Sequence, residues 1–336
     1  MTIKKFYTLL ILWLILPFAI SAKEFIHIEQ SFDTKKQHFI NEINGQFGYT
    51  DEALQALFQQ IHPDKKILAK ISRPAEKTTP WFKYQKIFAD KSRLTNGVKF
   101  YQQHQATLQQ AYEKYGVPPS IIVAIIGVET RYGKIMGKDK VIQALSTIGF
   151  GYPKREKFFT KELKSFLQMC AENQLDPLSL RGSYAGAMGM AQFMPSSYLH
   201  YSVDYDGDGK RDLWHNPDDA IFSVANYLAE NGWQRDEPIT DEAMTIAPAN
   251  YQGKYNHKPF TTLSDLNLQG FNTKTLIADS NQEVGLLKLA GKNEPLYFIT
   301  FNNFSVITTY NTSPMYAMAV FNLAKSIESQ LTEHHK

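Results

Sequence analysis

The chain of 336 residues contains one cysteine, Cys170, and this scarcity excludes an internal disulfide. A chain of this length can bury an adequate core without such cross-links, so the single cysteine is compatible with export. Cys170 lies in a segment, 161–173, whose apolar residues Leu163, Phe166 and Leu167 share one side of an amphipathic helix with it. We therefore expect Cys170 to be a small core hydrophobe.

The chain also lacks a strong charge of one sign. Its formal net charge is +3, which falls to +1 when Lys4 and Lys5 are removed. A nearly neutral chain has no electrostatic footprint for nucleic acid, so nucleic acid is excluded as a partner. The sequence shows no internal repeat or low-complexity tract, and beyond its first 22 residues no apolar run is long enough to span a membrane.

The first 22 residues are typical of a secretory signal peptide. A short basic start at Lys4 and Lys5 precedes an apolar run over 6–20 that ends in small residues. A membrane anchor is the alternative, but the run is short for a span of about 20 residues and contains Pro17. We expect cleavage after Ala22 and, because no cysteine lies near this position, no lipid attachment at cysteine. The mature protein is expected to be soluble and periplasmic.

Hydrophobic periodicity predicts a mainly helical chain with a small β region. Pro118 and Pro119 should open a helix whose body, Ile121–Val128, is apolar nearly all round and therefore central and buried. Further helices are expected at 39–47, 52–61, 98–114, 156–173, 217–231 and 315–331, and antiparallel strands at 284–289 and 296–301.

Glu129 follows the apolar run 125–128, where a carboxylate is costly unless it is paired, protonated or used in chemistry. Partial burial raises the pKa of a carboxyl group, and a raised pKa lets a Glu donate a proton near neutral pH, as glycoside cleavage requires. The alternative is a structural ion pair with Arg131 or another cation.

The segment 182–196, Gly-Ser-Tyr-Ala-Gly-Ala-Met-Gly-Met-Ala-Gln-Phe-Met-Pro-Ser, is rich in small residues that allow close approach of the backbone. Ser183 and Gln192 add neutral hydrogen-bonding groups that suit sugar hydroxyls and acetamides. The approaching group is either a ligand or a neighbouring helix at a packed crossing, and this pattern alone leaves both open.

Three motifs together resemble the membrane-bound lytic murein transglycosylase B family. They are Gly-Val-Glu-Thr-Arg-Tyr-Gly at 127–133, the segment 182–196, and Ser-Val-Ala-Asn-Tyr at 223–227. The resemblance is continuous from about Trp81 to Trp233 and resumes at 309–313 and 316–320, whereas the β-rich stretch between them matches only in general character.

The resemblance implies a mainly α (α+β) fold: a lysozyme-like catalytic core, a flanking helical domain and a small antiparallel β domain. On this basis we expect a signal peptide at 1–22, a helical N-terminal domain at 23–115 and the catalytic core at 116–237. A β-rich domain would follow at 238–305, and a C-terminal cleft segment and helix at 306–336.

The implied activity is non-hydrolytic cleavage of the β-1,4 bond between N-acetylmuramic acid and N-acetylglucosamine in peptidoglycan, in cell-wall turnover or remodelling. The sole acid/base of the family falls on Glu129, which protonates the glycosidic oxygen and then takes the proton of the muramyl C6 hydroxyl as that oxygen closes on C1. The product is a 1,6-anhydromuramic acid end. Ordinary glycosidases need a second carboxylate, whereas here the nucleophile is tethered to the substrate.

The resemblance also places substrate contacts. The family's sugar-binding positions fall on Ser183, Gln192, Tyr227, Tyr310 and Asn311, and Tyr84 is a further aromatic cleft candidate; core packing is the alternative for each aromatic residue. Lys154 and Arg155 stand where the family commonly has two arginines, and only Arg155 retains the bidentate fork for an acidic peptide stem or lactyl group.

The segment 204–212 matches the start of an EF-hand calcium loop, with acidic oxygens from Asp204, Asp206 and Asp208, the Lys210 carbonyl, and Asp212 further on. Position 12 of such a loop is His215, a poor calcium ligand. The resemblance implies a longer loop, 204–219, closed by Asp219, with Asp218 as a nearby alternative. We expect a structural Ca²⁺ and no cofactor for catalysis; an Asp/Gly-rich turn that contacts only water is the alternative.

Three other functions remain open: a hydrolytic muramidase on the same fold, a non-catalytic wall-binding or scaffold protein, and a calcium-dependent adhesive module. The expected substrate is the peptidoglycan glycan strand, the expected state is a monomer, and proteins of cell-wall synthesis or hydrolysis are candidate partners.

Overall fold

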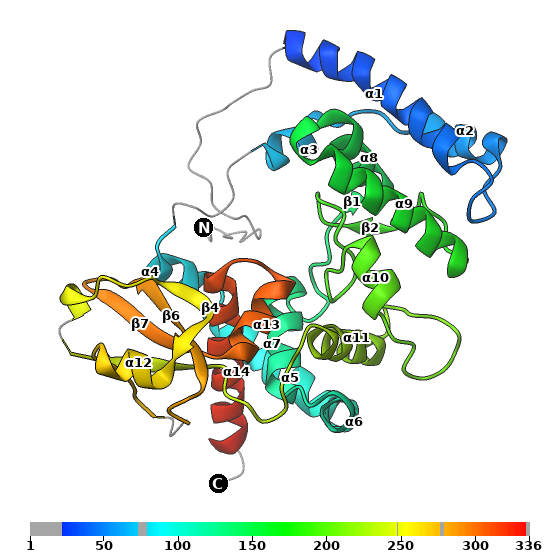
Figure 1. Ribbon diagram of the computed structural model, residues 1–336. Helices are drawn as coiled ribbons and strands as arrows, with labels where there is room; N and C mark the ends of the chain where they lie inside the picture. Colours follow the sequence, from blue (N-terminus) through cyan, green and yellow to red (C-terminus); the bar gives the residue numbers. More distant parts are fainter. Residues whose placement is uncertain (1–21, 73–78, 247, 276–278, 334–336) are drawn as a thin grey trace, which may run out of the picture.

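The computed structural model of the chain describes residues 22–72, 79–246, 248–275 and 279–333 (Figure 1). The predicted signal peptide, 1–22, lies outside these residues except for Ala22 and stays a prediction. Within the described ranges, no helix has the length and apolar character needed to cross a membrane.

The N-terminal part of the chain is helical, as predicted. Its elements are α1 (Ala22–Ile43), α2 (Asp51–Gln59), α3 (Lys65–Ile71), α4 (Trp81–Tyr84), η1 (Gln85–Ile87), α5 (Lys91–Gln103) and α6 (Gln105–Tyr115). The prediction of one helix over 98–114 is wrong, because α5 ends before His104 and α6 begins after it. The His104 Nδ1 lies 2.9 Å from the Asp218 Oδ1, a contact between distant parts of the chain that periodicity does not reveal.

The central helix is α7 (Pro119–Thr130), which begins at a proline as predicted. Residues 120–127 and Thr130 are buried, and α5, α6, α11 and α14 pack around the helix. Because α7 is apolar on every side, it can be covered on every side. The helix therefore runs through the core, and its last turn places Glu129 at the edge of the core, partly exposed.

The helical part of the chain continues beyond α7. Its elements there are β1 (Asp139–Lys140), α8 (Val141–Gly151), η2 (Pro153–Arg155), α9 (Glu156–Glu172), β2 (Arg181–Gly182), α10 (Pro195–Tyr201) and α11 (Pro217–Glu230). Helices α8 and α9 pack together, and α1 and α3 both contact α8 (Figure 1). Cys170 is 1% exposed on α9 and is the core residue we expected.

The β region is a five-stranded antiparallel sheet in the order β4-β6-β7-β3-β5. Its elements are β3 (Thr240–Thr245), η3 (Pro248–Asn250), β4 (Asn256–Thr262), α12 (Leu263–Leu268), β5 (Phe271–Thr273), β6 (Glu283–Ala290) and β7 (Pro295–Thr300). The two predicted strands, 284–289 and 296–301, are β6 and β7. Leu266, Phe271 and Ile299 belong to a small separate core, whereas Leu287 and Leu289 belong to the main core.

The chain returns to the centre through α13 (Asn302–Tyr310) and α14 (Pro314–Glu333). Helix α14 packs along α7, and the two helices lie side by side in the lower half of Figure 1. Because of this return, residues near the end of the chain reach Glu129. The architecture is the predicted mainly α fold with a small antiparallel β region.

Candidate active site

Glu129 lies in the last turn of α7 and, like Val128, is partly exposed, whereas residues 120–127 are buried. The Tyr316 hydroxyl, on α14, donates a hydrogen bond of 2.6 Å to the Glu129 Oε1. Burial raises the pKa of the Glu129 carboxyl to about 7, and the Tyr316 hydrogen bond opposes this rise. The group can therefore carry a proton at neutral pH and still lose it readily, as an acid that later acts as a base requires.

The alternative interpretation, an ion pair between Glu129 and Arg131, is wrong. Arg131 donates to both carboxylate oxygens of Asp90 instead, at 3.2 and 3.1 Å. No cation contributes to the pKa shift of Glu129 in the described part of the chain. The structure thus leaves the Glu129 carboxyl with a phenol as its hydrogen-bond partner.

A left-handed turn follows Glu129 and ends α7. Arg131, Tyr132 and Gly133 all have positive φ angles, of 51°, 61° and 79°. Two non-glycine residues in a row in this region are uncommon and are kept there by surrounding contacts. Thr130 supplies one of them, since its hydroxyl donates to the Met190 carbonyl at 3.0 Å and accepts from the Gly133 amide at 3.0 Å. The end of α7 is thereby fixed to the segment 182–196.

The small residues of the segment 182–196 permit tight backbone packing, as predicted. A Cβ at Gly182 would overlap the Ala187 carbonyl, and one at Gly189 would lie 2.7 Å from the Leu213 Cβ. The segment forms turns and isolated bridges, Gly182 with Met188 and Met188 with Phe193, so the proposed helix–helix crossing is wrong. The glycines serve instead to fold a compact loop beside α7.

Ser183 and Gln192 both shape this loop. The Ser183 hydroxyl accepts from the Ala185 and Ala187 amides, at 3.3 and 3.0 Å. The Gln192 Nε2 donates to the Met136 and Gly189 carbonyls, at 3.2 and 2.9 Å. Since the amide oxygen of Gln192 has no hydrogen bond among the described residues, it remains available as an acceptor.

Two of the three aromatic candidates, Tyr227 and Tyr310, belong to a cluster of rings next to Glu129. The Tyr310 ring lies 4.8 Å from the Tyr227 ring and 5.9 Å from the Phe193 ring. The Tyr310 hydroxyl donates to the Ala191 carbonyl at 2.5 Å, and the Tyr227 hydroxyl donates to the Thr309 carbonyl at 2.7 Å. Burial is the main cause that raises the pKa values of Tyr310 and Tyr316, and the charge of Glu129 raises both values further. Tyr84 is 3% exposed and also raises the pKa of Tyr316.

Asn311 lies between two tyrosines of the site in the sequence, whereas the basic pair, Lys154 and Arg155, lies on a different element. The Asn311 Oδ1 accepts from the Ser313 amide at 3.1 Å, in the turn between Tyr310 and Tyr316. Lys154 and Arg155 are exposed on η2, and the Arg155 guanidinium lies 4.8 Å from the centre of the Phe158 ring. No contact among the described residues joins this pair to Glu129 or Tyr316.

The predicted calcium loop brings together three of its candidate ligands. Carboxylate oxygens of Asp204, Asp206 and Asp219 lie within 4.8 Å of one another, and Asp219 is fully buried. Burial, and then the charges of Asp206 and Asp204, raise the pKa of Asp219 to about 6 against two backbone hydrogen bonds that lower it. A divalent cation would relieve this repulsion, so the donor set suits Ca²⁺.

Two other candidates for this loop, Asp218 and Asp208, lie outside this group of three. The Asp218 carboxylate is bonded to His104, which favours Asp219 over Asp218 as the closing ligand. Asp208 accepts from the Lys210 amide at 2.8 Å and does not belong to the group of three. The Lys210 carbonyl stays a candidate ligand.

Sequence reasoning did not single out two residues of the site, Tyr316 and Asp90. Tyr316 stands within the matched stretch 316–320, and the buried pattern of α14 was the signal that it faces the core. Asp90 had a weaker signal, because it occupies the N-cap of α5 like many surface aspartates, and its bond to Arg131 depends on the tertiary fold.

Comparisons with known proteins find similarity over most of the chain. A family model described as "Transglycosylase SLT domain" matches residues 31–325. The chain is 39% identical over 300 residues to the membrane-bound lytic murein transglycosylase B of Escherichia coli strain K12, covering 87% of this chain and 82% of the relative.

Solved structures show the same similarity. The soluble lytic transglycosylase SltB1 from Pseudomonas aeruginosa superposes with a TM-score of 0.82 at 42% identity, over 89% of this chain and 99% of that one. The Escherichia coli lytic transglycosylase Slt35, solved in complex with calcium, has a TM-score of 0.81 at 38% identity, over 88% of this chain and 93% of that one.

Proposed function

The chain belongs to the transglycosylase SLT domain family and is a lytic transglycosylase of peptidoglycan, and from this premise we propose that Glu129 is its single catalytic acid and base. The enzyme cleaves the β-1,4 bond between N-acetylmuramic acid and N-acetylglucosamine without water and leaves 1,6-anhydromuramic acid ends. The observation that supports Glu129 most strongly is its carboxyl group, raised in pKa to about 7 and bonded to a phenol rather than to a cation.

The first step uses Glu129 in its protonated form. Because its pKa is about 7, a large fraction of the carboxyl groups carry a proton at neutral pH and can donate it to the departing glycosidic oxygen. The Tyr316 hydroxyl then donates to a full carboxylate, and such a charge-assisted hydrogen bond is stronger than the bond to the neutral acid.

The second step uses the carboxylate just formed. It accepts the proton of the muramyl C6 hydroxyl while that oxygen bonds to C1, which regenerates the acid and closes the anhydro ring. No second carboxylate contributes to the pKa of Glu129 among the described residues. This agrees with a reaction whose nucleophile belongs to the substrate, since the two-carboxylate mechanisms place the second group close by.

We place the substrate on the surface formed by the loop 182–196 and the tyrosines around Glu129. Tyr227 and Tyr310 offer partly exposed rings, and Gln192 and Asn311 offer amides, for the sugars and their acetamido groups. Tyr84 is buried, so we assign its ring to packing beside Tyr316. Arg155, with Lys154, is assigned to acidic groups of the peptide stem, at a distance from the reacting bond. The boundaries 116–237 for the catalytic core and 238–305 for the β-rich domain belong to the same proposal.

The setting of the enzyme is also part of the proposal. Residues 1–22 act as the export signal, and the mature chain works on glycan strands in the periplasm as a monomer, with proteins of cell-wall synthesis or hydrolysis as candidate partners. Asp204, Asp206 and Asp219, with the Lys210 carbonyl, hold a structural Ca²⁺. The calcium complex of Slt35 and the buried carboxylate of Asp219 support this assignment.

The test is mass spectrometry of purified peptidoglycan digested with the wild type and with Glu129→Gln. The wild type should release fragments with anhydro ends, and Glu129→Gln should release none while still sedimenting with peptidoglycan. Glu328→Gln is the matched control: Glu328 accepts from the Ser120 hydroxyl at the opposite end of α7, and the variant keeps that acceptor.

The products separate the rival functions. Reducing ends from the wild type would indicate a muramidase, and intact peptidoglycan would indicate a wall-binding or adhesive protein. Undiminished release of anhydro ends by Glu129→Gln would refute the catalytic role of Glu129 and leave the family membership standing.

A further inference from the structure

Arg131 is the cation nearest to Glu129 in the sequence, and Asp90 binds its guanidinium group. The Nη1 and Nη2 atoms of Arg131 donate to the two carboxylate oxygens of Asp90. The Arg131 Nε is buried and has no hydrogen bond among the described residues. Asp90 is therefore the group that fixes the direction of the guanidinium.

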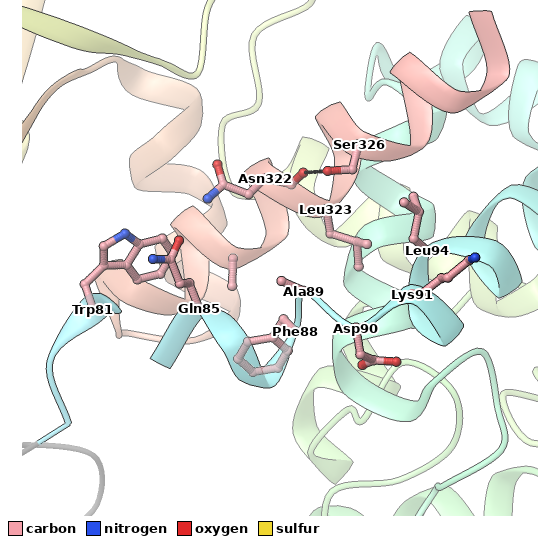
Figure 2. Close-up of a pocket in the computed structure, with 11 residues that line it drawn as sticks. Trp81, Gln85, Phe88, Ala89, Asp90, Lys91, Leu94, Asn322, Leu323 and Ser326 are labelled. Atoms are coloured by element: carbon pink, nitrogen blue, oxygen red, sulfur yellow. Dashed lines mark hydrogen bonds between the residues drawn. The ribbon is translucent and has the colours of Figure 1, made fainter. Parts of the chain in front are cut away.

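Asp90 is itself held in place by α5. Its Oδ1 accepts from the Arg93 amide at 3.0 Å and so caps the helix, and the Arg93 carbonyl accepts from the Tyr132 hydroxyl at 3.0 Å. The side chains of Arg131 and Asp90 are 26% and 34% exposed, so water screens the pair only in part. Figure 2 shows the Asp90 carboxylate at the start of α5, beside a pocket whose other wall is α14.

The groups that face Glu129 from the helices around α7 are phenols. Tyr316 of α14 and Tyr310 of α13 both interact with its charge. On α5, Arg93 interacts with Asp90, Arg131 and Tyr132. On α11, Tyr227 interacts with Tyr310, and on α6, Lys114 lies over the rings of Tyr115 and Phe222. Among the cations named here, Arg131 is the one nearest to Glu129 along the chain, and its guanidinium is bound by Asp90.

We propose that Asp90 is a positioning residue that holds the Arg131 guanidinium away from the Glu129 carboxylate. The proposal rests on the proposed function, because it matters only if Glu129 is the acid. Without its anionic partner, Arg131 is free to turn toward Glu129, two residues before it. A cation beside a carboxylate favours the charged form, so the acid would lose its proton at a lower pH.

The test compares the pH dependence of kcat/KM for the wild type and Asp90→Asn. The asparagine keeps an oxygen that caps α5 but removes the charge that binds Arg131. Activity of the wild type should fall as pH rises through about 7. In Asp90→Asn this decline should start at least about one pH unit lower, with at least about a fivefold loss at pH 7. Asp64→Asn makes the same change at the N-cap of α3 and should leave the profile unchanged.

A second variant distinguishes this role from support of the fold. Adding Arg131→Asn to Asp90→Asn removes the guanidinium, and asparagine tolerates the left-handed backbone at this position. The decline should then return toward its wild-type pH. A profile that is lowered at all pH values without displacement, and not restored in the double variant, would overturn the proposal.

The proposed function is tested separately in the same experiment. If Glu129→Gln is inactive and Asp90→Asn keeps the wild-type profile, only the role of Asp90 fails. If Glu129→Gln stays active, the proposed function fails, and the role of Asp90 fails with it.

Discussion

At the scale of single residues, the site depends on which neighbour each carboxylate has. Glu129 accepts a hydrogen bond from the phenol of Tyr316, and Asp90 forms an ion pair with the guanidinium of Arg131. Burial raises the pKa of Glu129, whereas the Tyr316 hydrogen bond lowers it. A phenol can donate to either form of the acid without carrying a charge at neutral pH, so Tyr316 can orient the carboxyl group and still leave it protonated.

Tyr316→Phe should move the decline of kcat/KM to higher pH. The variant removes the hydrogen bond that lowers the pKa of Glu129, so the acid keeps its proton to a higher pH, by up to about one pH unit. At pH values below 7, kcat of Tyr316→Phe should be lower than that of the wild type, because the carboxyl group loses its orienting partner. Tyr49→Phe removes a part-buried tyrosine hydroxyl that donates to the Leu167 carbonyl of α9, and it serves as the control. A decline at unchanged or lower pH in Tyr316→Phe would contradict this view of Tyr316.

At the scale of elements, the sequence predicts best the helices with one strong local pattern. The apolar run 121–128 and its opening prolines predict α7 because every signal is local. The helix α8 and the strands β3, β4 and β5 were not predicted, since their positions depend on partners far along the chain. The break at His104 is of the same kind, because Asp218, which contacts it, is more than a hundred residues away.

The candidate site divides in the same way. Glu129 stands out from the sequence because a carboxylate after an apolar run is locally conspicuous. Tyr316 lies 187 residues after Glu129 in the chain, and Asp90 lies 41 residues before its partner Arg131. Which anion binds Arg131 is a property of the folded chain, and the local pattern suggested only Glu129, the carboxylate two residues away.

The loop 204–219 should bind Ca²⁺ and stabilise the protein. Three carboxylates within 4.8 Å repel one another, and a divalent cation removes this repulsion. Adding Ca²⁺ at about 100 times its Kd to chelated protein should add about 2.7 kcal/mol of stability and raise Tm by several degrees. Asp219→Asn should abolish the increase, and Asp265→Asn, at the N-terminus of α12, should preserve it. An equal increase with Asp219→Asn would exclude Asp219 as a ligand.

At the scale of the whole molecule, the site is assembled from distant segments. Helix α7 supplies Glu129, the loop 182–196 covers one side, and α13 and α14 bring Tyr310 and Tyr316 from near the end of the chain (Figure 1). The burial that tunes Glu129 therefore exists only when these segments pack together. The free energy of ionising Glu129 in this buried setting therefore contributes to the stability of the complete fold.

Glu129→Gln should stabilise the protein at pH values above about 4.5, where the wild-type carboxyl group is ionised in the unfolded chain. The folded pKa, about 7, is higher than the unfolded value of 4.5, so between these values the unfolded chain binds fewer protons than the folded one. Stability of the wild type then falls as pH rises through this window. A shift of this size corresponds to at most about 3 kcal/mol, reached above pH 7.

Chemical denaturation of both proteins between pH 4 and pH 8 measures this term. At about pH 4 the two should have nearly equal free energies of unfolding, since the carboxyl group is neutral in both states. The advantage of Glu129→Gln should then grow up to neutral pH and stay constant beyond it. Burial raises the pKa of Asp219 as well, to about 6, so the comparison uses the difference between the two proteins, in which the contribution of Asp219 cancels. A difference that does not change with pH would mean that Glu129 is already ionised in the folded protein, and that a proton donor for the glycosidic bond must be sought in another group.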